Sequence, residues 1–156
     1  LYLAVRKGLE NEDGRARGTI KSVYRNLSYE EIKPLLPAIH QAVVESAPSG
    51  MMFADGIRAS GLEILAKHQI EEGMQLCLDV IEPDRWGQGK RIPKCLKTLQ
   101  VYGAAAKPLL PQLKELGTQF KKDDHLQLLQ QTIEKIESDP NSPELRSLKE
   151  SSAAAE

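Results

Sequence analysis

The chain has 156 residues, 40% of them hydrophobic and 28% charged, which is enough for one globular domain with its own core. A formal net charge of −1 argues against a nucleic-acid-binding module, because such modules normally carry a basic excess. No apolar run approaches the roughly 20 residues that a membrane-spanning helix needs, which argues against a membrane protein.

Apolar residues recur at helical spacing along almost the whole chain, and strand-like alternation is nearly absent. We interpret residues 1–12 as the end of a preceding helix and residues 13–138 as the helical domain. Within that domain we predict helices near residues 19–27, 30–46, 55–68, 71–82, 90–103, 107–120 and 123–138. Residues 139–156 are predicted to be a linker or flexible tail with at most one short helical turn.

Two near copies, "IKPLLPAIHQA" at residues 32–42 and "AKPLLPQLKEL" at residues 106–116, each place two prolines in an apolar helical pattern. The first proline of each copy, Pro34 and Pro108, fits the first turn of a helix, where a missing N–H group costs nothing. The second proline follows one turn later, so it either kinks the helix or marks its true start.

Local signals support several of the helix boundaries. Ser28 and Glu31 have the spacing of a capping box, and Asp55 is predicted to be an N-cap. Gly61 allows a close approach between helices. Trp86, in the connection "WGQGKR", is predicted to pack between two repeats.

The near copies belong to a longer period. When the second helices are aligned on Leu36, Leu76 and Leu110, the intervals are 40 and 34 residues, and periods of this length are typical of stacked helical hairpins. The stretch "DGIRASGLEILAKH" resembles the first helix of a HEAT repeat, in the armadillo-type α-solenoid group. The residues that carry this resemblance are Asp55, Arg58, Ala59, Leu62 and Leu65.

The resemblance also includes "YGAAAKPLLPQL" and "IKPLLPAI", which look like the turn into the second helix of such a repeat. It implies an all-α fold, a right-handed α-α superhelix of about three HEAT-like hairpins with a closing helix. It also implies that the second helices line an inner, concave surface. We therefore expect a non-catalytic protein-interaction or scaffold module of a larger, bacterial protein. Its partner would be a protein segment or a neighbouring domain of the parent chain.

Three features provide candidate partner-binding residues. The enlarged loop "PSGMMFADG" either tucks its apolar side chains beneath it as a local core or exposes them to a partner. The second helix near residues 71–82 would place acidic groups on the inner surface, while Lys90, Lys94 and Lys97 would form a basic stripe on the outer one. The candidates are Met51, Met52, Phe53, Glu71, Glu72, Gln75, Asp79 and Trp86.

Two other functions remain open. An accessory or catalytic domain of an enzyme could use the carboxylates of the groove, and a HEAT-like domain could bind nucleic acid if its concave face were basic. We predict no catalytic residue, cofactor or metal site. The histidines, His40, His68 and His125, fall in three different predicted helices without ligand spacing, and Cys77 and Cys95 fit buried thiols. The sequence does not indicate a cellular compartment.

Overall fold

The computed structural model describes residues 1–153, and every regular element in this range is helical, as predicted. The α-helices are α1 (Tyr2–Leu9), α2 (Gly14–Tyr24), α3 (Tyr29–Ile32), α4 (Leu36–Val44), α5 (Ala54–Lys67), α6 (Glu72–Asp79), α7 (Gln88–Gln100), α8 (Leu110–Leu116), α9 (Asp123–Ser138) and α10 (Leu148–Ala153). The 3₁₀ helices η1 (Lys33–Leu35), η2 (Met51–Phe53) and η3 (Gly103–Leu109) lead directly into α4, α5 and α8. Within the same range no helix is both long enough and apolar enough to cross a membrane.

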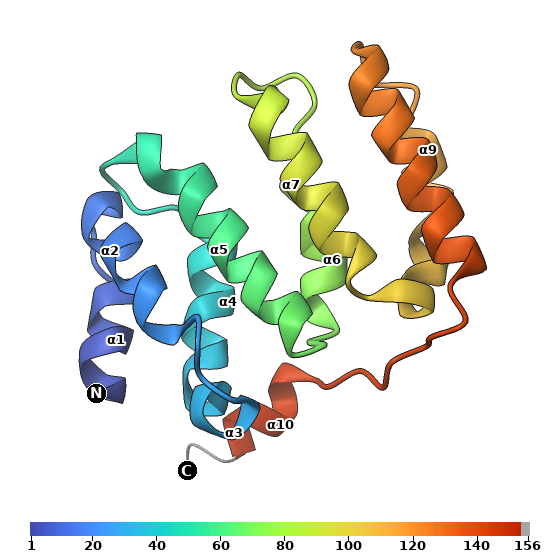
Figure 1. Cartoon of the computed structure of the whole chain (residues 1–156). Helices are drawn as coiled ribbons and strands as arrows, with labels where there is room; N and C mark the ends of the chain where they lie inside the picture. The colour runs from blue at the N-terminus through green and yellow to red at the C-terminus, as the bar shows by residue number, and fades with distance from the viewer. Residues whose placement is uncertain (154–156) are drawn as a thin grey trace.

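The helices form two rows. α2, α5, α7 and α9 follow one another across the molecule, and each contacts the next (Figure 1). Behind them α1 packs against α2, α4 packs against α5, and α6 contacts both α5 and α7. At the far end η3 and α8 pack against α9. From α4 to α7 the connections are short, and each α-helix contacts the next one along the chain.

The core consists of two adjoining clusters, and α5 contributes to both. Leu65 of α5 packs with Leu36 in the cluster that includes residues of α1, α2 and α4. Leu62, on another side of α5, packs with Leu96 in the cluster that extends to α9. All four leucines are buried, and burying each such side chain contributes about 1.5–3 kcal/mol. The apolar period of the sequence therefore identifies the inner faces of the central helices.

The repeated prolines mark helix starts. Pro37 and Pro111 lie in the first turns of α4 and α8, so the second proline of each copy begins a helix and does not kink one. Pro34 lies in the first turn of η1, as predicted, whereas Pro108 lies further inside η3. A 3₁₀ turn is tighter than an α-helical one, and here it leads the chain into the following α-helix.

Two local predictions are confirmed. Ser28 and Glu31 form the capping box: the Ser28 hydroxyl accepts from the Glu31 N–H at 3.3 Å, and the Glu31 carboxylate accepts from the Ser28 N–H at 2.8 Å. Gly61 lies where α5 crosses α4 closely. A Cβ atom at this position would lie only 2.4 Å from Cγ2 of Val43, so a larger residue would force the helices apart.

The helical spacing of apolar residues predicts that Leu110 and Leu126, near the end of the domain, are buried, but neither is fully buried in the structure. Leu110 is only partly buried, whereas Leu109 and Leu113, which the same spacing also predicts to be buried, are buried. The cause is η3, whose 3.0 residues per turn shift the register relative to a continuous α-helix. In α9 Leu126 is exposed, because the adjacent His125 occupies the inner position, 6.0 Å from the ring centroid of Phe120.

The segment after α9 was expected to be a linker, but its described part packs against the rest of the molecule. It runs from α9 along the lower side of the molecule in Figure 1 and places α10 against α4 and η1. Ser151 is fully buried, and Leu145 and Leu148 pack against the two core clusters. At the other end α1 buries Val5 and Leu9 in the cluster around α4, so residues 1–12 are also part of the packed body. Both segments depend on contacts that are distant in sequence, which local patterns do not reveal.

Candidate functional site

A groove of about 330 Å³ lies between α5 and α7. Its floor is apolar and includes the buried side chains of Leu62, Val80 and Cys95. Met52 and Trp86 stand on its rim with 77% and 73% of their surfaces exposed. Large apolar side chains that stay in water beside an apolar cavity are typical of a binding surface.

The α7 side of this groove is cationic. Lys90 and Lys94 line it one helical turn apart, and both side chains are exposed. In the part of the chain that the structure describes, neither lysine forms an ion pair. Arg58 lines the groove from α5, where its guanidinium binds Glu82 at 3.2 Å. The free charge at the groove is therefore positive.

Arg91 holds the connection between α6 and α7 in place. This buried guanidinium uses all five N–H groups, one of which reaches the Asp55 carboxylate at 3.1 Å. The other four donate to backbone carbonyl oxygens at 2.8 Å, those of Ile81, Glu82, Arg85 and Trp86. Because a planar guanidinium presents its donors in a fixed fork, these bonds fix the position of the loop that carries Trp86.

Asp55 is the acidic centre of the groove wall. Its carboxylate accepts hydrogen bonds from both Arg85 and Arg91. Partial burial favours the neutral acid, but the bonds and charges of the two arginines outweigh it and hold the pKa of Asp55 below its usual value. Asp55 therefore stays ionised and serves as a structural anion, which differs from its predicted role as an N-cap. Phe53 occupies the N-cap position of α5.

The enlarged loop before α5 is anchored at its base. Ser49 donates its backbone N–H to the Glu12 carbonyl at 3.0 Å, and its own carbonyl accepts from the Gly14 N–H at 2.9 Å. Gly50 has a φ of 67°, a conformation that favours glycine, and a Cβ there would lie 2.9 Å from a carboxylate oxygen of Asp13. The loop that leads to Met52 is thus fixed at its start.

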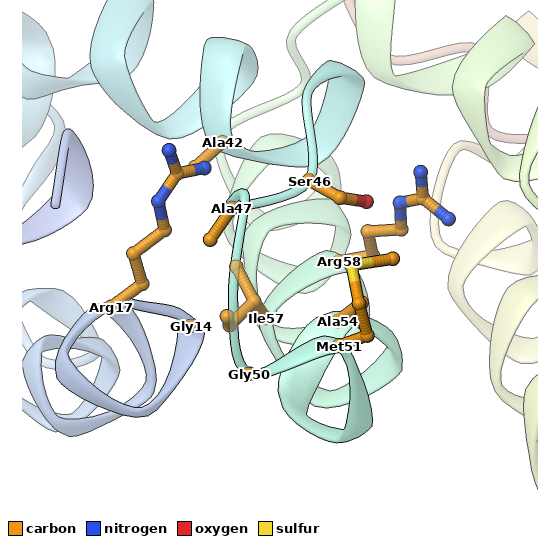
Figure 2. A pocket seen from close by; sticks show the side chains of 10 residues that line it. All are labelled: Gly14, Arg17, Ala42, Ser46, Ala47, Gly50, Met51, Ala54, Ile57 and Arg58. Carbon is orange, nitrogen blue, oxygen red and sulfur yellow. The ribbon is translucent and has the colours of Figure 1, made fainter. Parts of the chain in front are cut away.

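Two arginines flank this loop, as Figure 2 shows. Arg17 donates to the Glu45 carbonyl at 2.8 Å, and Arg58 donates to the Val43 carbonyl at 3.2 Å, so both satisfy carbonyl groups at the end of α4. The cavity between them has a volume of about 10 Å³ and is too small for an organic ligand. It therefore forms part of the scaffold, and the wider α5–α7 groove is the better candidate site.

The three apolar residues of the enlarged loop, Met51, Met52 and Phe53, do not all behave alike: one is packed in the core and two are exposed. Phe53 packs against the cluster around α4, which is the local-core arrangement. Met51 and Met52 remain 60% and 77% exposed. Only Met52 lines the α5–α7 groove, while Met51 lines the small cavity of Figure 2. Trp86 was expected to pack between repeats, but it lies on the rim because Arg91 holds its backbone there.

The predicted acidic residues of the α6 region do not form one site. Gln75 and Asp79 line a shallow groove between α6 and α8, where Gln75 donates to Asp79 at 3.0 Å. Gln75 and Gln112 also exchange side-chain hydrogen bonds at 2.9 and 3.1 Å. Glu72 points elsewhere and binds the segment before α10, and Glu71 is exposed beside it. Of the four candidates, Gln75 and Asp79 therefore share the groove between α6 and α8, while Glu71 and Glu72 lie outside it.

The groove is suited to binding more than to covalent chemistry. Burial raises the pKa of the Cys95 thiol to about 12, so the nucleophilic thiolate is not populated near neutral pH. Burial also raises the pKa of Cys77. Among residues 1–153 no group of histidine, cysteine and carboxylate side chains is arranged to hold a metal ion.

Sequence reasoning misses Arg91 and the groove itself. It indicates Lys90 and Lys94 only as part of an exposed basic stripe, and it gives Arg91 no role in a site. The acceptors of Arg91 are mostly backbone carbonyls. Because every residue has one, the sequence does not show which carbonyls will accept these hydrogen bonds. The usable signal is a run of three cations, Lys90, Arg91 and Lys94, beside an isolated tryptophan.

Comparisons with known proteins give no match: no family model, no curated protein and no solved structure is significantly similar to this chain.

Proposed function

We propose that this chain is a non-catalytic protein-interaction module whose α5–α7 groove binds an acidic protein segment with apolar side chains. The observation that carries the proposal is the combination of an apolar floor with the exposed rim residues Met52 and Trp86 and the unpaired lysines Lys90 and Lys94. An apolar side chain of the partner would enter the groove, and flanking carboxylates would meet the lysines.

The composition of the rim supports this kind of partner. Tryptophan is enriched at the energetic centres of protein interfaces, and methionine adapts to different apolar shapes. The Arg91 bonds fix the backbone beside Trp86, so little backbone freedom is lost when a ligand binds there. The partner could be a separate protein or a neighbouring domain of a longer parent chain.

The same lysines would also attract a polyanion, so nucleic acid is the competing ligand. Against it stand the net charge of −1 and the small number of free cations at the groove. A phosphate backbone needs several well-placed cations, and its affinity then falls steeply with salt. An apolar floor adds nothing to phosphate binding, so a mixed acidic and apolar peptide fits the groove better.

Trp86 provides a direct test, because it is the only tryptophan in the sequence and lies on the rim. The probe is the synthetic peptide EDLFEDLLEE, titrated into the domain while tryptophan emission is recorded. We expect a saturable blue shift as Trp86 leaves water, with affinity in the micromolar range. The shift should weaken when salt is raised, because exposed charges are screened.

Matched variants separate groove binding from general charge effects. Replacing Lys90 and Lys94 together by Glu should weaken peptide binding by about tenfold or more, because attraction becomes repulsion. Lys7→Glu, an exposed lysine of α1 away from the groove, should leave binding within about twofold. No emission change with the peptide, or tighter binding of duplex DNA than of the peptide, would overturn the proposed function.

We further propose that the two helical rows are a short HEAT-like α-solenoid. The support is the order of contacts, in which α2, α5, α7 and α9 adjoin in sequence order while α4 and α6 pack behind them. Residues such as Leu62 and Leu96, which stand 34 apart in sequence, occupy equivalent buried positions in neighbouring first helices. An experimental structure with a constant rotation from pair to pair would support the solenoid, and an irregular rotation would reject it.

A further inference from the structure

Residues 145–151, which we call the clasp, pack against a surface formed by α3, η1, α4, α6 and the turn after α5. Within the clasp, Arg146 forms an isolated parallel β-bridge with Ile70. The Arg146 N–H donates to the Gln69 carbonyl at 2.8 Å, and the Glu71 N–H donates to the Arg146 carbonyl at 2.9 Å. This is the pairing by which an edge captures an extended peptide.

The side chain of Arg146 is recognised as well as its backbone. Its guanidinium carbon lies 3.9 Å from the ring centroid of Tyr29, within the range of a cation–π contact. One of its nitrogens donates to the His68 carbonyl at 3.2 Å, at the C-terminal end of α5, where the helix dipole favours a cation. Lysine could not reproduce this combination of a flat contact and a directed donor.

Glu72 recognises the two residues that follow. Its carboxylate accepts from the Ser147 hydroxyl at 3.0 Å and from the Leu148 N–H at 3.1 Å. The Leu148 side chain then packs against the cluster around α4, and Ser151 is completely buried. Glu72, which the sequence suggested as a free acid of the inner surface, is thus a receptor group for the clasp.

The receptor turn has an unusual backbone. Gln69 has a φ of 57°, a left-handed conformation that is unfavourable for a residue other than glycine, asparagine or aspartate. This conformation ends α5 and directs the Gln69 carbonyl to the Arg146 N–H. The site is therefore shaped for a peptide with arginine, one small polar residue and leucine in succession.

We propose that this site is a receptor for an Arg-Ser-Leu segment, and that it accepts the clasp of a second copy of the chain in exchange for its own. The copy is the occupant that the structure supports, because its clasp is identical to the segment already seated. In the closed form a chain binds its own clasp, and in the exchanged form each of two chains binds the clasp of the other. Both forms would contain the same contacts at the site. They would differ only in the path of the connecting residues 139–144.

The connecting segment has the properties of an exchange hinge. It contains Pro140 and Pro143, which favour an extended path, and residues 140–142 and 144 are exposed. Among the described residues it makes two backbone hydrogen bonds to the helical body. The Asp139 N–H donates to the Lys135 carbonyl at 3.0 Å at the end of α9, and the Asn141 carbonyl accepts from the Ala104 N–H at 3.1 Å. A tether of this length gives the chain's own clasp an effective concentration of about 1 mM, so micromolar wild-type protein should remain closed.

The receptor is tested first with a labelled peptide of residues 143–153 and the full-length variant Arg146→Ala, whose own clasp is weakened. We expect saturable binding by fluorescence anisotropy, and about tenfold weaker binding to the wild-type chain, where the intact clasp competes. A peptide with alanine in place of its arginine should bind about tenfold more weakly to the variant. Failure of the peptide to bind a variant that keeps its helical circular dichroism would overturn the receptor.

Exchange is tested by removing residues 140–143, which shortens the reach of the connection by about 13 Å. The clasp can then not return to its own site but can still reach that of another copy. We expect a dimer by analytical ultracentrifugation at concentrations where the wild type is a monomer. Adding Arg146→Ala to the deletion should restore the monomer. A deletion variant that stays monomeric at all concentrations, while the peptide still binds, would retain the receptor and reject exchange between copies.

Discussion

The Arg91 guanidinium donates to the Asp55 carboxylate across 3.1 Å and so joins the start of α7 to the start of α5. The same guanidinium binds four carbonyls of the α6–α7 connection. One side chain therefore sets both the spacing of two helices and the position of the tryptophan on the groove rim. Its replacement should affect stability and binding together.

Arg91→Lys should destabilise the domain by about 2–4 kcal/mol, because a lysine cannot reach five acceptors and leaves buried carbonyls unpaired. The free energy of unfolding from urea titration measures the loss. Arg85→Lys is the matched control, since Arg85 is more exposed and its side-chain partners among residues 1–153 are the two carboxylates of Asp55 and Glu82. Equal losses in the two variants would contradict the central role of Arg91.

The same Gly→Ala change should have opposite effects at two helical sites. Gly61→Ala places a Cβ 2.4 Å from Val43, so α4 and α5 must separate, and we expect a loss of about 1–3 kcal/mol. A Cβ added at Gly18 in α2 would meet no neighbouring atom within 4 Å, so Gly18→Ala should stabilise by about 0.5–1 kcal/mol. Thermal unfolding measures both changes. A stabilising Gly61→Ala would mean that the two helices are not in close contact.

The loss of stability on a Leu→Ala substitution should increase with the burial of the leucine. Leu62 is fully buried in the cluster that extends to α9, so Leu62→Ala should cost about 2–5 kcal/mol through lost transfer energy and a residual cavity. Leu126→Ala on the exposed side of α9 should cost less than about 1 kcal/mol. Chemical denaturation of the two variants measures the difference, and similar losses would place the core elsewhere.

Stability should decrease as the pH falls from 7 to 5. Burial lowers the pKa of His40, His68 and His125 below the reference value of 6.5, and at His68 the nearby charges of Lys67 and Arg146 lower it further. The unfolded chain therefore binds more protons below about pH 6.5 than the folded one, and protonation favours unfolding. The stabilising effect of the neutral histidines is complete above that pH and is lost below it.

His68→Gln tests the contribution of one of these histidines. His68 is buried, and its Nε2 atom has no hydrogen-bond partner in the described structure, so a neutral amide removes a titrating group while keeping a polar side chain. Urea titrations at pH 7 and pH 5 should show a smaller difference for the variant than for the wild type. An identical pH dependence in both proteins would exclude His68 as a contributor.

The sequence predicted the parts of the fold that depend on local order. The spacing of Leu62 and Leu96 located inner helix faces, and the pair Ser28 and Glu31 located a helix start, because both signals act within a few residues. Leu110 was misplaced because a change from α to 3₁₀ geometry in η3 has no strong residue signature. The all-helical class and most helix boundaries could therefore be predicted from the sequence.

The candidate site was harder to predict from the sequence than the fold, because its residues come together only in the folded chain. Met52 and Trp86 were both suspected, yet nothing in the sequence brings them to one groove. The contact of Arg146 with Tyr29 joins distant parts of the chain, and the residues around Arg146 have the composition of an ordinary tail. Long-range recognition of backbone carbonyls cannot be inferred from residue type alone.

The clasp also limits how many helical pairs the array can hold. Residues 139–145 run from the end of α9 back to the turn after α5, so their length matches one particular distance across the rows. Each additional pair would move that starting point by about 8–10 Å, the usual spacing of packed helices. About three more extended residues would then be needed to reach Ile70. The length of the connecting segment therefore limits the distance that can be bridged. If a helical pair were inserted without lengthening this segment, Arg146 should no longer reach Ile70.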